Sequence, residues 1–301
     1  MHWSKVLSKV LRSPIKDNYL ISGNTTMGIG GYAEHFVEPH SKEDIVSILK
    51  TKTDLDFPLY IIGGGSNLII RQGSIRGLFL STRKLSDISV RSIRENFLFE
   101  VQAGVSVSNV LKKAFSVSAE GLEYLVGIPG TIGGAISGNA GGKGYAISNN
   151  ISWIESIEPD GSFRRWDKNE IEWNYRFCSL SSDKRIITRA GLKLSHGNAD
   201  TIRTKTRTFW EIRKDQPYNY KSAGCIFKNP EGYSAGKLLD ECGCKGLKSG
   251  EAMISMKHAN FIINLGSADY SDVLNLIGEC RSRVLDRTGL DLELEVRLID
   301  A

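Results

Sequence analysis

The motif SAGCIFKNP, residues 222–230, places a cysteine among residue types that suit a reactive site. Cys225 follows Ala223 and Gly224, whose small size allows another molecule to approach closely. Its thiol can be a buried packing group, a metal ligand, half of a disulfide or an acid facing a substrate. A thiol has a pKa of about 8.5, so it is mostly protonated at neutral pH and can donate a proton. The other motifs of the chain have to decide among these roles.

The five cysteines, at positions 178, 225, 242, 244 and 280, argue against metals and disulfides. Their odd number suits a reducing compartment. Cys242 and Cys244 are separated by one residue, whereas zinc ligands are usually separated by about two to four. No second pair follows them in the sequence. We therefore expect neither a metal site nor disulfide bonds.

Composition and charge are those of an ordinary globular protein, with 41% hydrophobic and 24% charged residues. The N-terminal segment lacks the apolar centre of a signal peptide, and no run of about 18 apolar residues occurs, so we expect a cytoplasmic chain without a membrane span. The densest basic stretch, residues 201–214, is either a solvated helix face or an electrostatic approach for a phosphate-bearing ligand. No nucleic-acid-binding motif accompanies it, so nucleic acid is not an expected partner.

Glycine is unusually frequent, with 31 residues that cluster at 28–31, 63–65 and 127–144. The motif GGGSN, residues 63–67, follows an expected strand, but the residues after it also read as a strand. It therefore lacks the helix that a Rossmann fingerprint requires, and the chain has no Walker motif. Its glycines still present bare amide groups to phosphate oxygens, and Ser66 and Asn67 add side-chain donors.

The second glycine loop, VGIPGTIGGAISGNAGG, covers residues 126–142. Pro129 and the small residues after it can begin a short helix whose free N–H groups face an anion. Taken singly, each loop is better explained as a tight turn in a compact sheet. Two such loops in one chain indicate a dinucleotide instead.

Helices and strands alternate without regular βαβ order, which predicts an α+β architecture. Helices are expected at 41–50, 108–118, 199–214, 234–241 and 269–288. A hairpin is expected at 151–166, through Asp160 and Gly161. The other expected strands are 59–62, 67–70, 78–81, 97–102, 185–194, 259–264 and 290–299.

Six motifs occur in this order: YIIGGGSNLII, GIPGTIGGAISGNAGG, NYRFCS, SAGCIFKNP, AGKLLDECGCKG and LELEV. The glycine loops alone resemble the wide family of FAD enzymes with a vanillyl-alcohol-oxidase-like (PCMH-type) fold. All six together, over about residues 20–299, resemble the UDP-N-acetylenolpyruvoylglucosamine reductases of peptidoglycan precursor synthesis, in the short class that lacks an extra substrate loop. The resemblance implies an N-terminal segment (1–24), an FAD-binding domain (25–195, in lobes of about 25–80 and 81–195) and a C-terminal substrate domain (200–301).

The resemblance implies FAD as cofactor and NADPH as co-substrate. The flavin is expected to be noncovalent, because neither glycine loop contains a histidine or cysteine that could tether it. The cofactor-binding residues expected from the two loops are Gly63, Gly64, Gly65, Ser66, Asn67, Gly127, Ile128, Pro129, Gly130, Thr131, Gly133, Gly134, Asn139 and Ala140.

The implied reaction adds a hydride to the enolpyruvyl C3 of a UDP-sugar and a proton to C2. Charge then develops on the substrate carboxylate, and the resemblance assigns its stabilisation to Arg176 and Glu295. Glu295 can do this only if it is protonated or bridged through a donor, which its expected setting in an apolar strand favours. Cys225 corresponds to the proton donor, a position where many members carry serine. Taken alone, Arg176 is better explained as a member of a surface ion pair and Glu295 as a solvated strand-edge carboxylate, and only the order of the motifs favours the catalytic roles.

Four further residues are expected to bind the substrate, namely Tyr175, Arg213, Lys228 and Asn229. Cys178 departs from the family pattern, which often has serine at that position. Two other functions compete with the reductase. One is another FAD-dependent oxidoreductase of the same fold, such as an alcohol oxidase. The other is a nonenzymatic UDP-sugar- or nucleotide-binding module.

Overall fold

The structure is a computed structural model that describes residues 2–181 and 185–300. It divides into two compact units that interleave along the sequence. The first unit comprises Met1–Asp17, His35–Gly64 and Gly77–Arg213, and the second comprises Asn18–Glu34, Gly65–Arg76 and Lys214–Ala301. The boundaries predicted at residues 24, 195 and 200 separate an N-terminal segment, a cofactor domain and a substrate domain. They stay a prediction.

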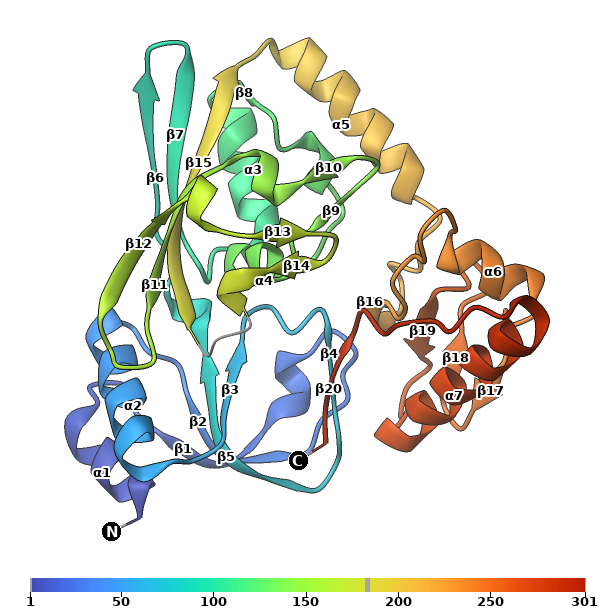
Figure 1. The fold of residues 1–301 in the computed structure, drawn as a ribbon, viewed down its shortest axis with the longest axis horizontal. Helices are drawn as coiled ribbons and strands as arrows, with labels where there is room; N and C mark the ends of the chain where they lie inside the picture. Colours follow the sequence, from blue (N-terminus) through green and yellow to red (C-terminus); the bar gives the residue numbers. More distant parts are fainter. Residues whose placement is uncertain (1, 182–184, 301) are drawn as a thin grey trace. The chain divides into compact units, whose positions relative to one another are not determined.

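The first unit contains a six-stranded sheet (Figure 1). Its main path has the order β12-β11-β15-β7-β6, and β8 also pairs with β15. The strands are β6 (Ile88–Ile93), β7 (Asn96–Gln102), β8 (Ala119–Glu120), β11 (Ile151–Ile157), β12 (Phe163–Asp167) and β15 (Ile186–His196). The antiparallel pair β11–β12 confirms the predicted hairpin, and Gly161 has the positive φ of 83° that its turn requires.

Helices α3 (Val107–Ser116) and α4 (Ile132–Ser137) contribute buried side chains to the core that also includes this sheet. Apolar residues recur along α3 with helical spacing, so that one face is buried. Those residues are Val107, Val110, Leu111 and Ala114. Helix α5 (Ala199–Arg213) follows β15 in the chain and ends the first unit.

A second core of the first unit lies under α1 (Trp3–Val10) and α2 (Lys42–Leu55). The Trp3 ring stacks on Phe57 with 4.2 Å between ring centroids, and Leu7 is fully buried. The strands near these helices belong to a four-stranded sheet with the order β1-β2-β5-β3. They are β1 (Lys16–Leu20), β2 (Tyr32–Val37), β3 (Leu59–Ile62) and β5 (Ser74–Ser81).

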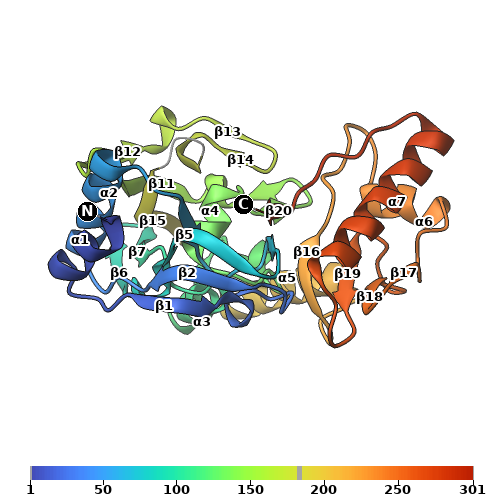
Figure 2. The ribbon, with the colours of Figure 1, turned by 90° about the horizontal axis from the view of Figure 1, so that it is seen from below.

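The second unit contains an antiparallel sheet of order β16-β19-β18-β17, with α6 and α7 beside it (Figure 2). Cys280 and Val284 of α7 are fully buried in the same core as the sheet residues. The elements are β16 (Lys221–Cys225), α6 (Ala235–Glu241), β17 (Lys248–Ser249), β18 (Ala252–Ile254), β19 (Phe261–Asn264) and α7 (Tyr270–Thr288). A separate parallel pair joins β4 (Leu68–Ile70) to β20 (Arg297–Ile299).

Short elements connect these layers. Two small hairpins are β9 (Gly141–Gly142) with β10 (Tyr145–Ala146), and β13 (Trp173–Asn174) with β14 (Phe177–Cys178). The 3-10 helices are η1 (Ile21–Asn24), η2 (Thr82–Lys84), η3 (Glu123–Leu125), η4 (Ile147–Asn149), η5 (Lys168–Glu170) and η6 (Ser179–Ser181).

The α+β prediction is confirmed, but the predicted strand over 290–299 is wrong for most of its length. Only Arg297–Ile299 form a strand, so Glu295 lies outside it. The alternation of leucine with acidic residues in this segment imitates a strand. In the structure the segment changes partner, because Leu294 makes an isolated bridge with Phe227 whereas Arg297 pairs with β4.

A buried carboxylate fixes the segment between α1 and β1. Asp44, in the first turn of α2, is only 3% exposed. Its oxygens accept the N–H groups of Arg12 at 2.9 Å and Ser13 at 3.0 Å, and the Ser13 hydroxyl at 2.6 Å. A buried N–H without a partner is costly, so this carboxylate stabilises the attachment of the N-terminal helix.

We expect Asp44→Ala to lower the free energy of unfolding by about 2–4 kcal/mol, because three donors lose a charged acceptor in a buried place. Urea unfolding followed by circular dichroism measures the change. Asp54→Ala is the control, since Asp54 lies on the same helix but is exposed. Equal unfolding midpoints for the two variants would contradict the anchoring role of Asp44.

Candidate functional site

The two glycine loops meet within the first unit. A Cβ atom on Gly64 would lie 2.5 Å from the Cα of Gly130, and one on Gly63 would lie 2.4 Å from Oγ1 of Thr131. Real Cβ atoms do not approach other heavy atoms this closely. The glycines at 63 and 64 are therefore required for the two loops to touch.

Arg83 sets the orientation of the first loop, and it was not among the residues predicted from the sequence. Its Nε donates to the Gly63 carbonyl at 3.2 Å and its Nη2 to the Gly64 carbonyl at 3.0 Å. In a trans peptide the N–H of the next residue points opposite to the carbonyl. The amides of Gly64 and Gly65 therefore point away from Arg83, in an arrangement that suits phosphate oxygens. No motif connects residue 83 to this loop, so the sequence carries no signal for it.

The expectation that α4 offers free N–H groups to an anion is wrong. Its first N–H groups are used within the protein, since Ile132 donates to Val105 and Gly133 donates to Ala103, both at 2.8 Å. Gly134 donates to the side chain of Thr131, which is the N-cap of the helix. Pro129 precedes this cap and does not begin the helix. These hydrogen bonds attach the start of α4 to neighbouring residues, so its first N–H groups are not available to bind an anion.

Other residues of the second loop support its conformation. A Cβ on Gly133 would lie 2.9 Å from that of Ala103, so this glycine permits close packing. Ile128 and Ala140 pack against the core of the unit. Asn139 is buried, and its Nδ2 donates to the Asn174 carbonyl at 3.0 Å. These contacts leave the cofactor roles predicted for the loop as predictions.

Arg213, the last residue of α5, holds the segment that leads into this loop. Its Nη1 donates to the carbonyls of Tyr124 at 2.7 Å and Val126 at 3.2 Å. Gly127 follows with a φ of 78°, a conformation that favours glycine. Arg213, which the sequence predicts to bind the substrate, thus fixes backbone at the start of the second glycine loop.

Tyr175 and Arg176 form the turn between β13 and β14. Arg176 has a φ of 57°, which is uncommon for a residue other than glycine. Its Nη1 makes a long hydrogen bond of 3.4 Å to the Gly141 carbonyl, and its guanidinium lies 5.1 Å from the centre of the Tyr175 ring. The turn therefore presents an exposed tyrosine and a cation beside the end of the second glycine loop. Cys178, just after it, is fully buried, and burial raises the pKa of its thiol to about 11.

Cys225 ends strand β16 in the second unit, and a bulge directs it. The pairing with β19 changes register between Ser222 and Cys225, and Gly224 between them has a φ of 80°. A bulge reorients the side chains that follow it, and such bulges often occur next to active sites. Cys225 is partly exposed as a residue and is not part of a disulfide.

The backbone of Glu295 is hydrogen-bonded to two segments, namely the residues that follow Cys225 and the GGGSN motif. Its N–H donates to the carbonyl of Ile226, the residue after Cys225, at 2.8 Å. Its carbonyl accepts the side-chain amide of Asn67 at 2.9 Å. The structure thus brings together three predicted residues of the second unit, namely Asn67, Cys225 and Glu295.

Lys228 and Asn229 lie shortly after Cys225 in the chain, and the side chains of both contact other residues of the protein. The Lys228 ammonium pairs with Glu293, and its backbone N–H donates to the Glu293 carbonyl at 2.8 Å. The Asn229 Oδ1 accepts the N–H of Ala235, the first residue of α6, at 2.9 Å. A phosphate bound by Lys228 would therefore have to compete with Glu293 for the ammonium.

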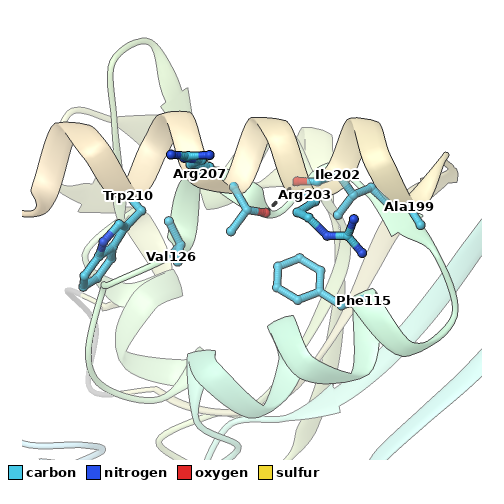
Figure 3. Close-up of a pocket in the computed structure, with 8 residues that line it drawn as sticks. Phe115, Val126, Ala199, Ile202, Arg203, Arg207 and Trp210 are labelled. Carbon is cyan, nitrogen blue, oxygen red and sulfur yellow. Dashed lines mark hydrogen bonds between the residues drawn. The ribbon is translucent and has the colours of Figure 1, made fainter.

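A pocket of about 470 Å³ lies between α3 and α5 in the first unit (Figure 3). Phe115, Ile202 and Trp210 line it with apolar side chains, and Arg203 and Arg207 also line it. It contains none of the site residues predicted from the sequence. Across residues 2–181 and 185–300, no helix is long and apolar enough to cross a membrane, and no group of three potential metal ligands occurs.

Two family models match the chain. The model of an FAD binding domain matches residues 33–167, and that of the C-terminal domain of UDP-N-acetylenolpyruvoylglucosamine reductase matches residues 216–299. The reductase of Carboxydothermus hydrogenoformans is 36% identical over 97% of this chain and 96% of its own length. That of Clostridium tetani is 36% identical over 99% and 97%. The crystal structure of the Thermus caldophilus reductase is 33% identical, with a TM-score of 0.81, over 96% of this chain and 100% of the other.

We expect Gly64→Ala to purify with much less FAD, because the new Cβ would collide with the backbone of Gly130 and separate the loops. The ratio of flavin to protein absorbance measures the loss, and acid precipitation should release the flavin from the wild-type protein. Gly138→Ala is the control, since its Cβ meets only the Gly134 oxygen at an ordinary 3.7 Å. Full flavin occupancy in Gly64→Ala would show that the cofactor lies elsewhere.

Proposed function

Because the chain belongs to the UDP-N-acetylenolpyruvoylglucosamine reductase family, we propose specific roles for its residues in the reduction of enolpyruvyl-UDP-N-acetylglucosamine to UDP-N-acetylmuramate. The protein is an FAD-dependent oxidoreductase of peptidoglycan precursor synthesis, with NADPH as co-substrate. The predicted FAD-binding fold of the vanillyl-alcohol-oxidase type is likewise confirmed. The observation that supports the residue roles best is the backbone hydrogen bond between Glu295 and Ile226, which fixes two candidate catalytic segments to each other.

The first glycine loop fits a flavin pyrophosphate. Arg83 binds the carbonyls of Gly63 and Gly64, and this turns the following amides toward the opposite side, where a phosphate can accept them. The absence of Cβ atoms at these positions lets the second glycine loop pack directly against this backbone. When bound, FAD accepts a hydride from NADPH and supplies it to C3 of the enolpyruvyl group.

Arg176 and Glu295 are proposed to act at the substrate carboxylate. Hydride addition to C3 moves electron density toward C2 and the carboxylate, so a fixed cation stabilises the transition state more than the ground state. The turn conformation of Arg176 and its contact with Gly141 limit the positions that its guanidinium can take. Glu295 is only partly buried and lies outside β20, so it is proposed to assist through a bridging hydrogen-bond donor.

Cys225 is proposed to complete the reaction by giving its thiol proton to C2. The C=C bond is then converted to a single bond, C3 has gained the hydride and C2 the proton, and the thiolate recovers a proton from water. The bulge at Gly224 reorients the end of the strand, where Cys225 is a partly exposed residue. A thiol is a stronger acid than the hydroxyl of serine, so cysteine can replace serine in this step.

Tyr175, Arg213, Lys228 and Asn229 are proposed to bind the UDP-sugar. Tyr175 is 51% exposed at a hairpin tip and can cover a bound sugar. To bind a phosphate oxygen, the Lys228 ammonium would give up its ion pair with Glu293. The Glu293 side chain is 73% exposed, and breaking an exposed ion pair costs little free energy. We also propose a cytoplasmic location, since none of the five cysteines, all in the described segments, forms a disulfide.

We expect Arg176→Ala to slow reoxidation of the reduced flavin by the enolpyruvyl substrate by about 10²–10³-fold, the usual cost of losing one fixed charge-stabilising donor. Reduction of the flavin by NADPH should change far less. Anaerobic stopped-flow absorbance measures the two half-reactions separately. Arg164→Ala is the control, because Arg164 is a surface residue of β12 outside the proposed site. Equal damage to both half-reactions would instead indicate a role in flavin placement.

We expect Cys225→Ala to be reduced by NADPH at a near-normal rate but to reoxidise about 10²–10⁴-fold more slowly with substrate, the usual cost of losing a general acid. Cys225→Ser should remain active, because a hydroxyl can occupy the same position. The measurement is stopped-flow reoxidation of the reduced enzyme.

Cys242→Ala serves as the matched control, since Cys242 is also a partly exposed thiol of the second unit. Iodoacetamide should inactivate the wild-type enzyme and Cys242→Ala, but not Cys225→Ser. A wild-type reoxidation rate in Cys225→Ala would mean that another group donates the proton.

A further inference from the structure

Asn67 makes two hydrogen bonds that lead to the same segment of chain. Its backbone carbonyl accepts the N–H of Arg297 at 3.0 Å, and its Nδ2 donates to the carbonyl of Glu295 at 2.9 Å. The parallel pairing of β4 with β20 begins next to it, at Leu68 and Arg297. The Asn67 side chain therefore adds one more hydrogen bond to this pairing, at Glu295, which precedes the first residue of β20.

The acceptor of this additional hydrogen bond is Glu295, which is not part of a strand. Glu295 lies before β20, in a segment without regular structure. Its N–H is bound by Ile226, and its carbonyl is bound by the Asn67 amide. Removing the amide would leave the Glu295 carbonyl without this donor, while its N–H stays bound to Ile226. The Cα atom of Glu295 would then be less restrained, and so would the carboxylate that it bears.

We propose that Asn67 is a positioning residue for Glu295, through its side-chain amide, rather than only a donor to the cofactor. This inference rests on the role proposed above for Glu295. Catalytic groups need to be held within about 0.5 Å of their productive position, and a displacement of about 1 Å can reduce a rate by about 10²-fold. The geometry gives the GGGSN motif a second task, which is to fix an acidic side chain almost 230 residues later in the chain.

The test uses the FAD-saturated holoenzyme and compares Asn67→Ala with Glu295→Ala and the double variant. In Asn67→Ala the maximal rate of reoxidation by substrate should fall about 10–100-fold further than the rate of reduction by NADPH. The substrate concentration for half-maximal reoxidation should change little. The double variant should be no slower than Glu295→Ala, because Asn67 has no effect once the carboxylate is gone.

Asn264→Ala is the matched control. Its Nδ2 likewise donates to a backbone carbonyl of the second unit, that of Met27, at 3.0 Å, and its side chain is buried. It should lose stability without a selective effect on reoxidation. Asn67→Asp, which keeps the size but removes the donor, provides a second variant if Asn67→Ala folds poorly, and it should show the same selective loss.

The outcomes separate this inference from the proposed function. Slow reoxidation of Glu295→Ala with wild-type reoxidation of Asn67→Ala would overturn the positioning role alone. Multiplying effects in the double variant, or an equal loss in both half-reactions of Asn67→Ala, would also overturn it. Wild-type reoxidation of Glu295→Ala would overturn the role of Glu295 itself, and the positioning role with it.

Discussion

Two hydrogen bonds to the backbone of Glu295 determine the arrangement of the second unit's catalytic candidates. One comes from Glu295 to the carbonyl of Ile226, next to Cys225, and the other comes from the side chain of Asn67. Three segments that are far apart in sequence thereby share one fixed geometry. Glu295 lies outside β20, and these two bonds fix its backbone on both sides of its Cα atom.

In the first unit, arginine side chains fix the backbone of the two glycine loops. Arg83 binds two carbonyls of the first glycine loop, and Arg213 binds two carbonyls before the second. The guanidinium group is suited to this task because it carries several donors in a rigid plane. Glycine at 64 then allows the two loops to touch. The resulting surface is peptide backbone, which suits a phosphate-bearing cofactor.

Local sequence patterns predicted most elements because their signals lie within a few residues. Ser41 caps α2, Gly161 forms the turn of the β11–β12 hairpin, and the apolar spacing of α3 matches its buried face. The motifs also placed Cys225 and Glu295 among the site candidates. What the sequence could not predict depends on distant partners. Alternating leucines at 290–299 indicated one strand, but the segment pairs with Phe227 and then with β4.

The same limitation explains the errors at the glycine loops. The first N–H groups of α4 are used by Ala103 and Val105, whose proximity no local pattern reveals. Arg83 has no sequence relation to the loop that it orients. Family motifs thus identify which residues gather at the site, whereas the structure shows which of them bind a ligand directly and which hold their neighbours.

An anaerobic single turnover tests the central claim most directly. The purified flavoprotein is first titrated with NADPH, and enolpyruvyl-UDP-N-acetylglucosamine is then added while flavin absorbance and product mass are followed. The account predicts that NADPH removes the absorbance of oxidised flavin, that the sugar restores it, and that the product carries two more hydrogens than the substrate. A flavin that NADPH reduces but the sugar does not reoxidise would contradict the account, and it would favour another oxidoreductase of the same fold.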